Sequence, residues 1–406
     1  MKKIIKFIVV FILFIFFLIL DIYLIKNTFY DKYKIPEEVV FNYENEVVLS
    51  SNENYFNLIK DKNVDILSED EKINTESTGT KTKTITIKYN KKKYYYKMNV
   101  NVIDVTKPLI LNYQSNITTT LMNVAYPCDR ALYIDDYDTK PSCVIDGNVS
   151  YDEEGSYPVK MTISDKSGNK VEKDVTIKVV EKISSSSKGT SSSSKPTYIN
   201  FEDIVKEHKN NNTMIGIDIS KWQGNIDFDK VKEAGCEFVI IRIGVQAGRN
   251  YEHSVDSNYS TYIKDAKRAG LKVGVYVYTT ALNYDDGVKT AEFVINTLGD
   301  EKLDLGVSYD WENYQYIMEY ETSLRNLSDG YKGFRDKLKS KGLESHFYAS
   351  KYYLENFWID IDEPVWLAHY NSETTYQGKY FMWQRTSNGK IDGIPDNTVD
   401  IDILYK

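Results

Sequence analysis

The stretch Leu305-Gly306-Val307-Ser308-Tyr309-Asp310-Trp311-Glu312 decides the fold predicted for the C-terminal half of the chain. An apolar run that becomes polar at its end predicts a buried strand that leads into a loop. Residues two apart in a strand point the same way, so the carboxyls of Asp310 and Glu312 would face one spot. Close carboxylates push their proton affinities apart, and one can then stay protonated near neutral pH. On an isolated surface strand the same two groups would only face solvent.

Other apolar runs of strand length surround this stretch from about residue 213 onward. They first alternate with helical patterns at 259–269, 285–298 and 323–340, and later only with short segments rich in Gly, Asn, Ser and Pro. A parallel crossover needs about a dozen residues or more, and the last gaps are too short or too broken for one. We therefore expect an irregular, TIM-like (β/α) barrel of eight strands that lacks some helices and has at least one antiparallel pair. The other expected strands are 215–220, 238–244, 272–278, 345–349, 364–370, 380–384 and 399–403.

In such barrels the chemistry collects at the carboxyl ends of the strands. Acidic and aromatic residues stand at those ends: Asp218, Tyr278, Asp310, Glu312, Tyr348, Tyr370, Trp383, Gln384 and Asp400 or Asp402. Acids transfer protons and aromatic faces stack on sugar rings, a combination suited to cleaving a glycosidic bond. Asp400 and Asp402 would face the same way, so either could be the functional acid, and Asp400 is favoured.

Length, charge and cysteine content limit the number of domains and the kinds of partner and metal site that the chain can have. A chain of 406 residues has room for two or three domains. A net charge of -8 argues against nucleic acid as the main partner. Three Cys without a Cys-x-x-Cys pair, together with four His, argue against a zinc site. We expect neither a metal nor another cofactor.

Residues 1–36 predict a cytoplasmic tail followed by a transmembrane helix. The run Phe7–Leu20 is uninterrupted and apolar, Asp21 breaks it, and apolar residues continue to Ile25. The whole stretch is about long enough to span a bilayer. Cleavage of a signal peptide needs small residues, yet the first Gly is Gly79 and the first Ala is Ala125. A cleaved signal peptide and a buried core helix are the alternatives to an uncleaved anchor.

Charges around this segment suggest its orientation. Lys2, Lys3 and Lys6 precede it, and basic residues favour the cytoplasmic side. Lysines also follow the segment, at Lys26 and nearby positions, and they weaken this argument. The expected location is the cell membrane, crossed once, with the C-terminal domain outside the cell.

Two strand-rich modules, 37–105 and 106–182, precede a Ser-rich linker at 183–212 and the domain at 213–406. Each has a Gly, an alternating strand, a polar turn and a second alternating strand, which predicts a degenerate repeat of two small antiparallel sandwiches. The second is similar to bacterial immunoglobulin-like domains of surface proteins, through Thr106-Lys107-Pro108 and the turn at 164–169. Cys128 and Cys143 either form a disulfide, which would stabilise the module by roughly 3 kcal/mol, or remain buried thiols.

The C-terminal domain resembles glycoside hydrolase family 25, the Chalaropsis-type lysozymes or N-acetylmuramidases. The matching pieces are 216–224, 238–242, 274–278, 309–312, 383–384 and 399–402. The resemblance implies an irregular barrel with fewer helices than strands. It also implies cleavage of the β-1,4 bond between N-acetylmuramic acid and N-acetylglucosamine in peptidoglycan.

The resemblance further implies a role for each matching residue. Glu312 would be the general acid, and Asp310 would stabilise the developing positive charge or hold the substrate's acetamido group. Asp218 and Asp400 would tune these two, and the groove would be lined by Tyr278, Tyr348, Tyr370, Trp383 and Gln384. The family often has Asn where this chain has Asp402, so the last motif departs from the pattern.

The predicted function is a membrane-anchored enzyme that cuts peptidoglycan glycan strands from outside the membrane. The alternatives are a catalytically silent wall-binding protein and an adhesin in which the two β modules do the main work. The sequence indicates no particular protein partner and does not distinguish retaining from inverting chemistry.

Overall fold

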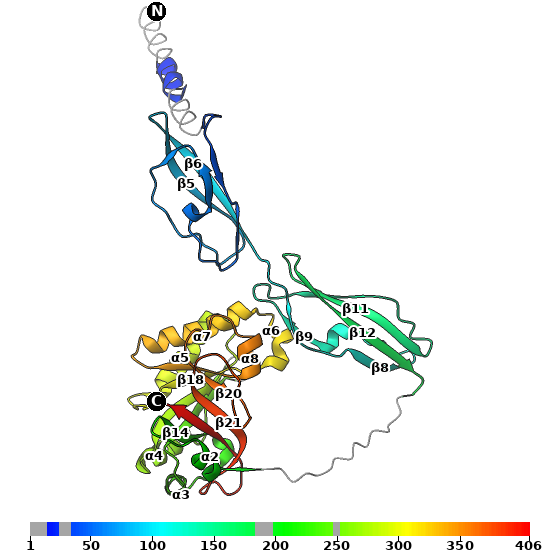
Figure 1. Ribbon diagram of the computed structural model, residues 1–406, viewed down its shortest axis with the longest axis vertical. Helices are drawn as coiled ribbons and strands as arrows, with labels where there is room; N and C mark the ends of the chain where they lie inside the picture. Colours follow the sequence, from blue (N-terminus) through cyan, green and yellow to red (C-terminus); the bar gives the residue numbers. More distant parts are fainter. Residues whose placement is uncertain (1–13, 24–33, 183–197, 247–251) are drawn as a thin grey trace, which may run out of the picture. The chain divides into compact units, whose positions relative to one another are not determined.

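The computed structural model describes residues 14–23, 34–182, 198–246 and 252–406 (Figure 1). It divides into two compact units, Met1–Thr106 and Lys107–Lys406. Residues 14–23 are helical, but no helix within the described ranges is long and apolar enough to cross a membrane. Residues 7–13 and 24–25 of the predicted membrane segment and residues 183–197 of the predicted linker 183–212 lie outside the described residues, so these parts remain predictions. The rest of the predicted linker is folded, which corrects its C-terminal boundary. It forms β13 (Ile199–Asn200) and α2 (Phe201–His208), and Phe201 and Ile204 of α2 are buried in the main hydrophobic cluster because α2 is amphipathic.

The first unit contains a four-stranded sheet of order β2-β6-β5-β4 and a two-stranded sheet, β1-β3. Its elements are β1 (Phe41–Tyr43), β2 (Glu46–Val48), η1 (Tyr55–Leu58), β3 (Ile59–Lys62), β4 (Asp65–Ile66), β5 (Gly79–Tyr89) and β6 (Lys92–Ile103). β5 and β6 pair along their whole length as a hairpin. Their alternating residues, among them Ile85, Ile87 and Met98, are fully buried. Period-two patterning therefore builds this core, as the sequence predicts.

The module at 107–182 repeats this topology. Its elements are β7 (Leu109–Tyr113), β8 (Asn116–Thr120), η2 (Pro127–Arg130), β9 (Ala131–Ile134), β10 (Ser142–Asp146), β11 (Gly155–Ser164) and β12 (Lys170–Val180). The sheets have the orders β10-β11-β12-β8 and β7-β9. β2 runs parallel to β6 and β8 runs parallel to β12, so the sheets are mixed rather than purely antiparallel as predicted. Cys128 and Cys143 form a disulfide, which decides between the two predicted alternatives.

The C-terminal part of the second unit is a closed barrel of eight strands. They are β14 (Thr213–Ile219), β15 (Phe238–Gln246), β17 (Lys272–Tyr278), β18 (Val307–Asp310), β19 (Ser345–Ser350), β20 (Val365–Ala368), β21 (Tyr380–Lys390) and β22 (Val399–Tyr405). β14 to β21 are parallel, and β22 closes the ring antiparallel to both β21 and β14. The eight strands and the antiparallel closure confirm the prediction, although β20 and β21 pair in parallel with only a loop between them.

Helices surround this barrel unevenly. Two short strands flank it, β13 (Ile199–Asn200) and β16 (His253–Val255). The helices are α2 (Phe201–His208), η3 (Lys221–Gln223), α3 (Phe228–Glu233), α4 (Tyr259–Arg268), α5 (Tyr284–Leu298), η4 (Tyr314–Tyr316), α6 (Ile317–Tyr320), α7 (Leu324–Lys339) and α8 (Lys351–Asn356). The three helical patterns predicted from sequence correspond to α4, α5 and α7, with bounds that differ by one or two residues.

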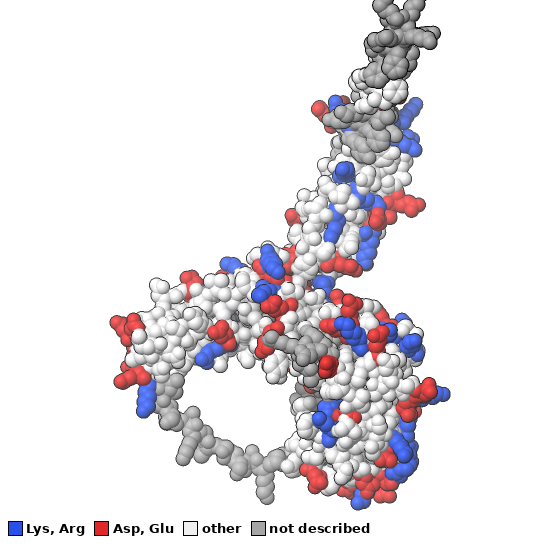
Figure 2. Space-filling view, turned by 180° about the vertical axis from the view of Figure 1, so that it is seen from behind, with Lys and Arg blue, Asp and Glu red and all other residues white. Residues whose placement is uncertain are grey.

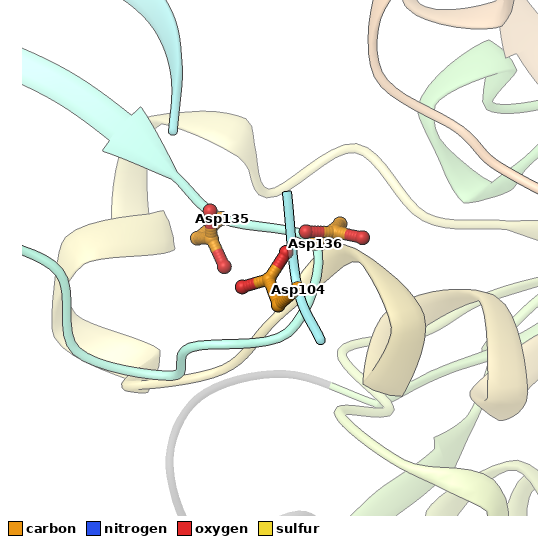
Figure 3. A group of neighbouring side chains, drawn as sticks. All are labelled: Asp104, Asp135 and Asp136. Carbon is orange, nitrogen blue, oxygen red and sulfur yellow. The ribbon is translucent and has the colours of Figure 1, made fainter. Parts of the chain in front are cut away.

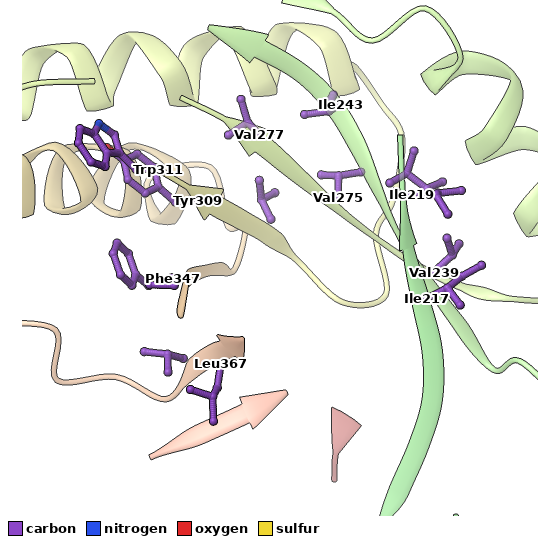
Figure 4. Close-up of a cluster of buried hydrophobic side chains, with 14 of the residues drawn as sticks. Ile217, Ile219, Val239, Ile243, Val275, Val277, Tyr309, Trp311, Phe347 and Leu367 are labelled. Carbon is purple, nitrogen blue, oxygen red and sulfur yellow. The ribbon is translucent and has the colours of Figure 1, made fainter. Parts of the chain in front are cut away.

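Each barrel strand contributes to two cores because its side chains alternate. Outward-facing residues such as Val275, Trp311 and Phe347 form the core between strands and helices (Figure 4). Inward-facing residues fill the lumen, whose buried apolar cluster includes Met214 and Phe238.

The module at 107–182 shares a core with the barrel. Ile134, at the end of β9, belongs to the same buried cluster as the outer core of the barrel. The loop after β9, in which Asp135 and Asp136 are labelled in Figure 3, then meets the start of α7. The Leu324 N–H donates to the Asp135 carbonyl at 2.9 Å, and the Arg325 N–H donates to the Asp136 carbonyl at 3.2 Å. Helix starts leave such N–H groups unpaired. The module therefore caps a helix of the barrel.

Candidate active site

Carboxyl groups gather at the end of the barrel where the parallel strands finish. Asp218 lies on β14 directly opposite Asp400 of β22. Asp310 is the last residue of β18, and Glu312 follows two residues later. Between them the Trp311 side chain is fully buried in the outer core, so the alternation predicted from sequence continues past the strand end.

Burial dominates the electrostatics of this group. It raises the pKa of Asp310 well above its usual value, and the nearby Glu312 and Asp218 raise it further. Burial, followed by the charge of Asp402, raises the pKa of Asp218 well above its usual value. Burial, with a contribution from Asp218, raises the pKa of Asp400 to about 9. Burial and mutual repulsion therefore favour the protonated forms of these carboxyls.

Glu312 differs from its neighbours in exposure. Its side chain reaches solvent, whereas Asp310 is buried. The protein atoms around Glu312 still hinder its solvation and raise its pKa. Glu312 is thus the carboxyl of this pair that combines access from outside with an increased tendency to stay protonated.

Asp310 is buried without a hydrogen-bond donor for one of its oxygens. Within the described residues no group donates to Oδ1. The positive charge of Arg242 acts on Asp310 and lowers its pKa, against the effect of burial. That guanidinium is itself paired with Asp256, at 2.7 Å from a terminal nitrogen and 2.8 Å from Nε. Sequence reasoning missed this pair, because Asp256 lies in a loop whose position depends on the fold.

A hydrogen-bonded chain orients Asp218. The Gln384 amide nitrogen donates to Asp218 Oδ2 at 2.8 Å. The hydroxyls of Tyr348 and Tyr370 both donate to the Gln384 amide oxygen at 2.9 Å. Two donors on the oxygen fix which way the amide points, so its nitrogen must face the acid. Three residues predicted as groove lining therefore also position a predicted catalytic carboxyl.

Asp402 lies deeper in the lumen than Asp400. It is fully buried, and its Oδ1 accepts a hydrogen bond from the Trp366 indole at 2.8 Å. Opposite it in register stands Gly216, where an added Cβ would lie 2.5 Å from the Phe238 carbonyl oxygen. Asp400, by contrast, remains partly accessible. This difference supports Asp400 as the acid that faces the groove, although Asp402 is close enough to affect the pKa of Asp218.

Tyr278 and Trp383 illustrate the two outcomes for predicted lining residues. The Tyr278 hydroxyl donates to the Asn313 side chain at 2.8 Å. Burial raises the pKa of Tyr278, and the nearby charges of Asp310 and Glu312 raise it further. Trp383 is buried in the outer core and donates to the His369 carbonyl at 2.8 Å. The structure therefore does not bring Trp383 into the group.

The loop after β14 adds an exposed aromatic side chain that sequence reasoning did not assign. Ser220 and Gln223 form a reciprocal capping box around η3, and the Gln223 amide also donates to the Thr398 carbonyl at 3.1 Å. These bonds tie the end of β14 to the start of β22. Between the two caps Trp222 is 68% exposed, four residues after Asp218. Its place within the matching motif is the signal that could have identified it.

The barrel part of the chain is similar in sequence to known proteins. A family model described as "Glycosyl hydrolases family 25" matches residues 217–394. An autolytic lysozyme from Clostridium acetobutylicum is 33% identical over 192 residues, which cover 47% of this chain and 55% of that protein. Lysozyme M1 from Streptomyces globisporus is 25% identical over 196 residues, which cover 44% of this chain and 64% of that protein. The chain thus spans about half to two thirds of the length of these relatives.

A solved structure of a family 25 glycosyl hydrolase from Bacillus anthracis also aligns with this chain. The sequence identity is 20%, the alignment covers 49% of this chain and 92% of that one, and the TM-score is 0.42.

Proposed function

We propose that the barrel is a glycosyl hydrolase domain of family 25 and cleaves the β-1,4 bond between N-acetylmuramic acid and N-acetylglucosamine in peptidoglycan. The observation that carries the proposal is the cluster of four carboxyl side chains at the strand ends, those of Asp218, Asp310, Glu312 and Asp400. Its members have raised pKa values and stand at different depths. Glycoside hydrolysis needs one carboxyl that is protonated and one that stabilises positive charge.

Glu312 is the proposed general acid. A proton donor must reach the oxygen of the leaving sugar, and Glu312 is exposed while Asp310 is buried. Desolvation raises the pKa of Glu312, which favours the protonated form that donates. On this proposal the bond between the anomeric carbon and the leaving oxygen breaks as that oxygen receives the proton. A water molecule then supplies the hydroxyl at the anomeric carbon, and its remaining proton goes to a carboxylate of the site.

Asp310 is the proposed partner on the substrate side. Its Oδ1 has no donor among the described residues, so an N–H of a bound sugar's acetamido group would satisfy it. When ionised, the same carboxyl would stabilise the positive charge that develops on the sugar ring. Asp218, held by Gln384, and Asp400 would set how readily these two residues lose their protons.

Exposed aromatic side chains beside the carboxyls are the proposed sugar-stacking surfaces. Trp222, Tyr316 and Tyr370 are each at least 45% exposed, and each follows the carboxyl end of a barrel strand. The remainder of the proposal concerns location. Residues 7–25 would anchor the chain in the cell membrane, with the barrel outside and the glycan strands of the wall as its substrate.

Digestion of purified peptidoglycan tests the activity. The full chain and its Glu312→Gln variant would each be incubated with peptidoglycan, and the new reducing ends identified by mass spectrometry after borohydride reduction. The expected product carries a reduced muramic acid end, formed by the full chain and not by the variant.

Other products would overturn the proposal in distinct ways. A reduced glucosamine end would indicate the other glycosidic bond, and released peptide would indicate a different bond class. Binding to peptidoglycan without any new reducing end would favour the silent wall-binding protein instead.

A further inference from the structure

The tip of the β5–β6 hairpin carries a concentrated positive charge, and Figure 2 shows Lys and Arg side chains gathered at this end of the first module. We define the hairpin tip as residues 88–93, Lys-Tyr-Asn-Lys-Lys-Lys, in which all four lysines are exposed. Asn90 and Lys91 have positive φ angles, +46° and +64°, as in a tight two-residue turn. Asp65, opposite Lys88 in register, is the nearest acid along the paired strands. None of the four lysines forms an ion pair with a described residue.

The matched hairpin of the other module lacks this charge. There β11 and β12 are joined by residues 165–169, and Lys170 begins β12. The segment 165–170 contains two lysines and one aspartate, and Lys166 is paired with Asp138 at 2.9 Å. Because the two modules share one topology, the basic tip is a property of the first module and not of the fold.

The chain enters the first module at the end where this tip lies. β2 runs parallel to β6 with Glu46 opposite Asn101, so residues before β2 lie toward the start of β6. The Phe41 ring is accordingly 4.7 Å from that of Tyr96.

Hydrogen bonds of the residues that precede Phe41 also place the entering chain at this end of the module. Asn63 bonds to the Val40 N–H and to the Glu38 carbonyl, both at 2.7 Å. Asp65, two residues after Asn63, lies opposite Lys88 of the tip in the backbone pairing of β4 with β5. The entering segment and the hairpin tip therefore share one end of the module.

An apolar stretch that ends at Ile25 precedes this entry point. Eight residues separate Ile25 from Lys34, so even fully extended the chain between them spans at most about 30 Å. An anchor in residues 7–25 would thus hold this end of the module near the bilayer surface. Lysines are attracted to anionic headgroups over about one Debye length, close to 10 Å at 0.1 M salt. Tyr89 lies among the lysines and Tyr94 follows them, both partly exposed, and amphipathic tyrosines suit a headgroup layer.

We propose that the hairpin tip of the first module rests on anionic lipid headgroups of the membrane in which the chain is anchored. This inference rests on the proposed anchor. The contact would hold the module against the membrane surface at its basic end, with its opposite end, where β6 finishes, directed away from the bilayer.

Lysine protection in vesicles tests the contact. The full chain would be reconstituted into vesicles of phosphatidylcholine alone and of phosphatidylcholine with phosphatidylglycerol, then treated with a membrane-impermeant amine-acylating reagent and analysed by mass spectrometry. Lys88 and Lys91 to Lys93 should react several-fold more slowly in the anionic vesicles at low salt, and protection should vanish near 1 M salt. Lys166 and Lys170 serve as internal controls and should react equally in both. Exchange of all four tip lysines for Gln should remove any salt-dependent protection of the nearby Lys97.

The possible outcomes separate the contact from the anchor. Equal reactivity of the tip in both vesicles, with the chain retained after alkaline carbonate washing, would overturn the contact and leave the anchor standing. Release by carbonate together with lipid-dependent protection would support the contact and refute the anchor. Protection by soluble polyphosphate equal to that by anionic vesicles would assign the tip to soluble polyanions and overturn the lipid proposal.

Discussion

The two ends of the barrel lumen are built from the same strands and have opposite chemistry. We call the end where the parallel strands finish the upper end of the lumen, and the end where they begin the lower end. On β14, Met214 lies at the lower end and Asp218 at the upper end. On β22, Leu404 lies at the lower end and Asp400 at the upper end. The lower end buries apolar side chains, which stabilises the folded chain. The upper end buries carboxyls, which costs stability wherever they would otherwise ionise. The difference shows that one face of a strand can contribute to packing at one end and present carboxyls for the proposed chemistry at the other.

The largest expected effect comes from removing the proposed acid at the upper end. Glu312→Gln should slow peptidoglycan lysis by about 100- to 10,000-fold, because general acid catalysis contributes about that much. Stability should change by less than about 0.5 kcal/mol, since the side chain is exposed. A turbidity assay and thermal unfolding measure the two effects. Glu319→Gln on α6 is the matched control, and lysis by Glu312→Gln at the rate of that control would refute the assignment.

A substitution at the lower end should give the reverse pattern. Phe238→Ala should lower the free energy of unfolding by about 3–5 kcal/mol, because it leaves a cavity in a fully buried cluster. All five Trp residues lie in the barrel, so tryptophan fluorescence during urea unfolding reports on this part alone. Lys272→Ala, exposed and opposite Phe238 in register, is the control and should change stability by less than about 0.5 kcal/mol. Similar losses in the two variants would contradict the packing role of Phe238 at this end of the lumen.

The pH dependence of stability should originate at the upper end. The pKa of Asp400 is raised from 3.8 to about 9, so its neutral form is favoured in the folded state. Its contribution to stability is present below the unfolded-state pKa and is lost as pH rises from about 4 to about 9. The midpoint of thermal unfolding should therefore be lower at pH 8.5 than at pH 5, and Asp400→Asn should reduce that difference. An unchanged difference in the variant would show that other groups cause it.

The smallest expected effect concerns the orientation of Gln384. Tyr370→Phe removes one of two hydroxyl donors to its amide oxygen. A hydrogen bond of this kind contributes about 1 kcal/mol, so the lysis rate should fall by about 5-fold. Tyr376→Phe, in the same loop, should leave the rate unchanged. Loss of all activity in Tyr370→Phe would instead indicate direct contact with the reacting sugar.

The eight strands and the group of acids could be predicted from the sequence because both depend on local patterns. Short apolar runs reveal strands, and period-two alternation places Asp310 and Glu312 on one side of Trp311. The same rule could have excluded Trp383, since adjacent residues cannot both face the lumen and Gln384 does. The pair of Arg242 and Asp256 could not be predicted, because it joins a strand to a loop through contacts that only the folded chain defines.

The cap that the loop after β9 places on α7 has a practical consequence for dissecting this molecule. A cut at the Ser-rich segment, the boundary suggested by composition, would divide a single hydrophobic core and remove Ile134 from it. Residues 199–406 produced alone would expose that apolar contact and leave the first backbone amides of α7 to solvent. Preparations intended to test the proposed activity should therefore begin no later than Lys107, because a shorter chain would lose these contacts and any loss of activity could then come from the packing defect.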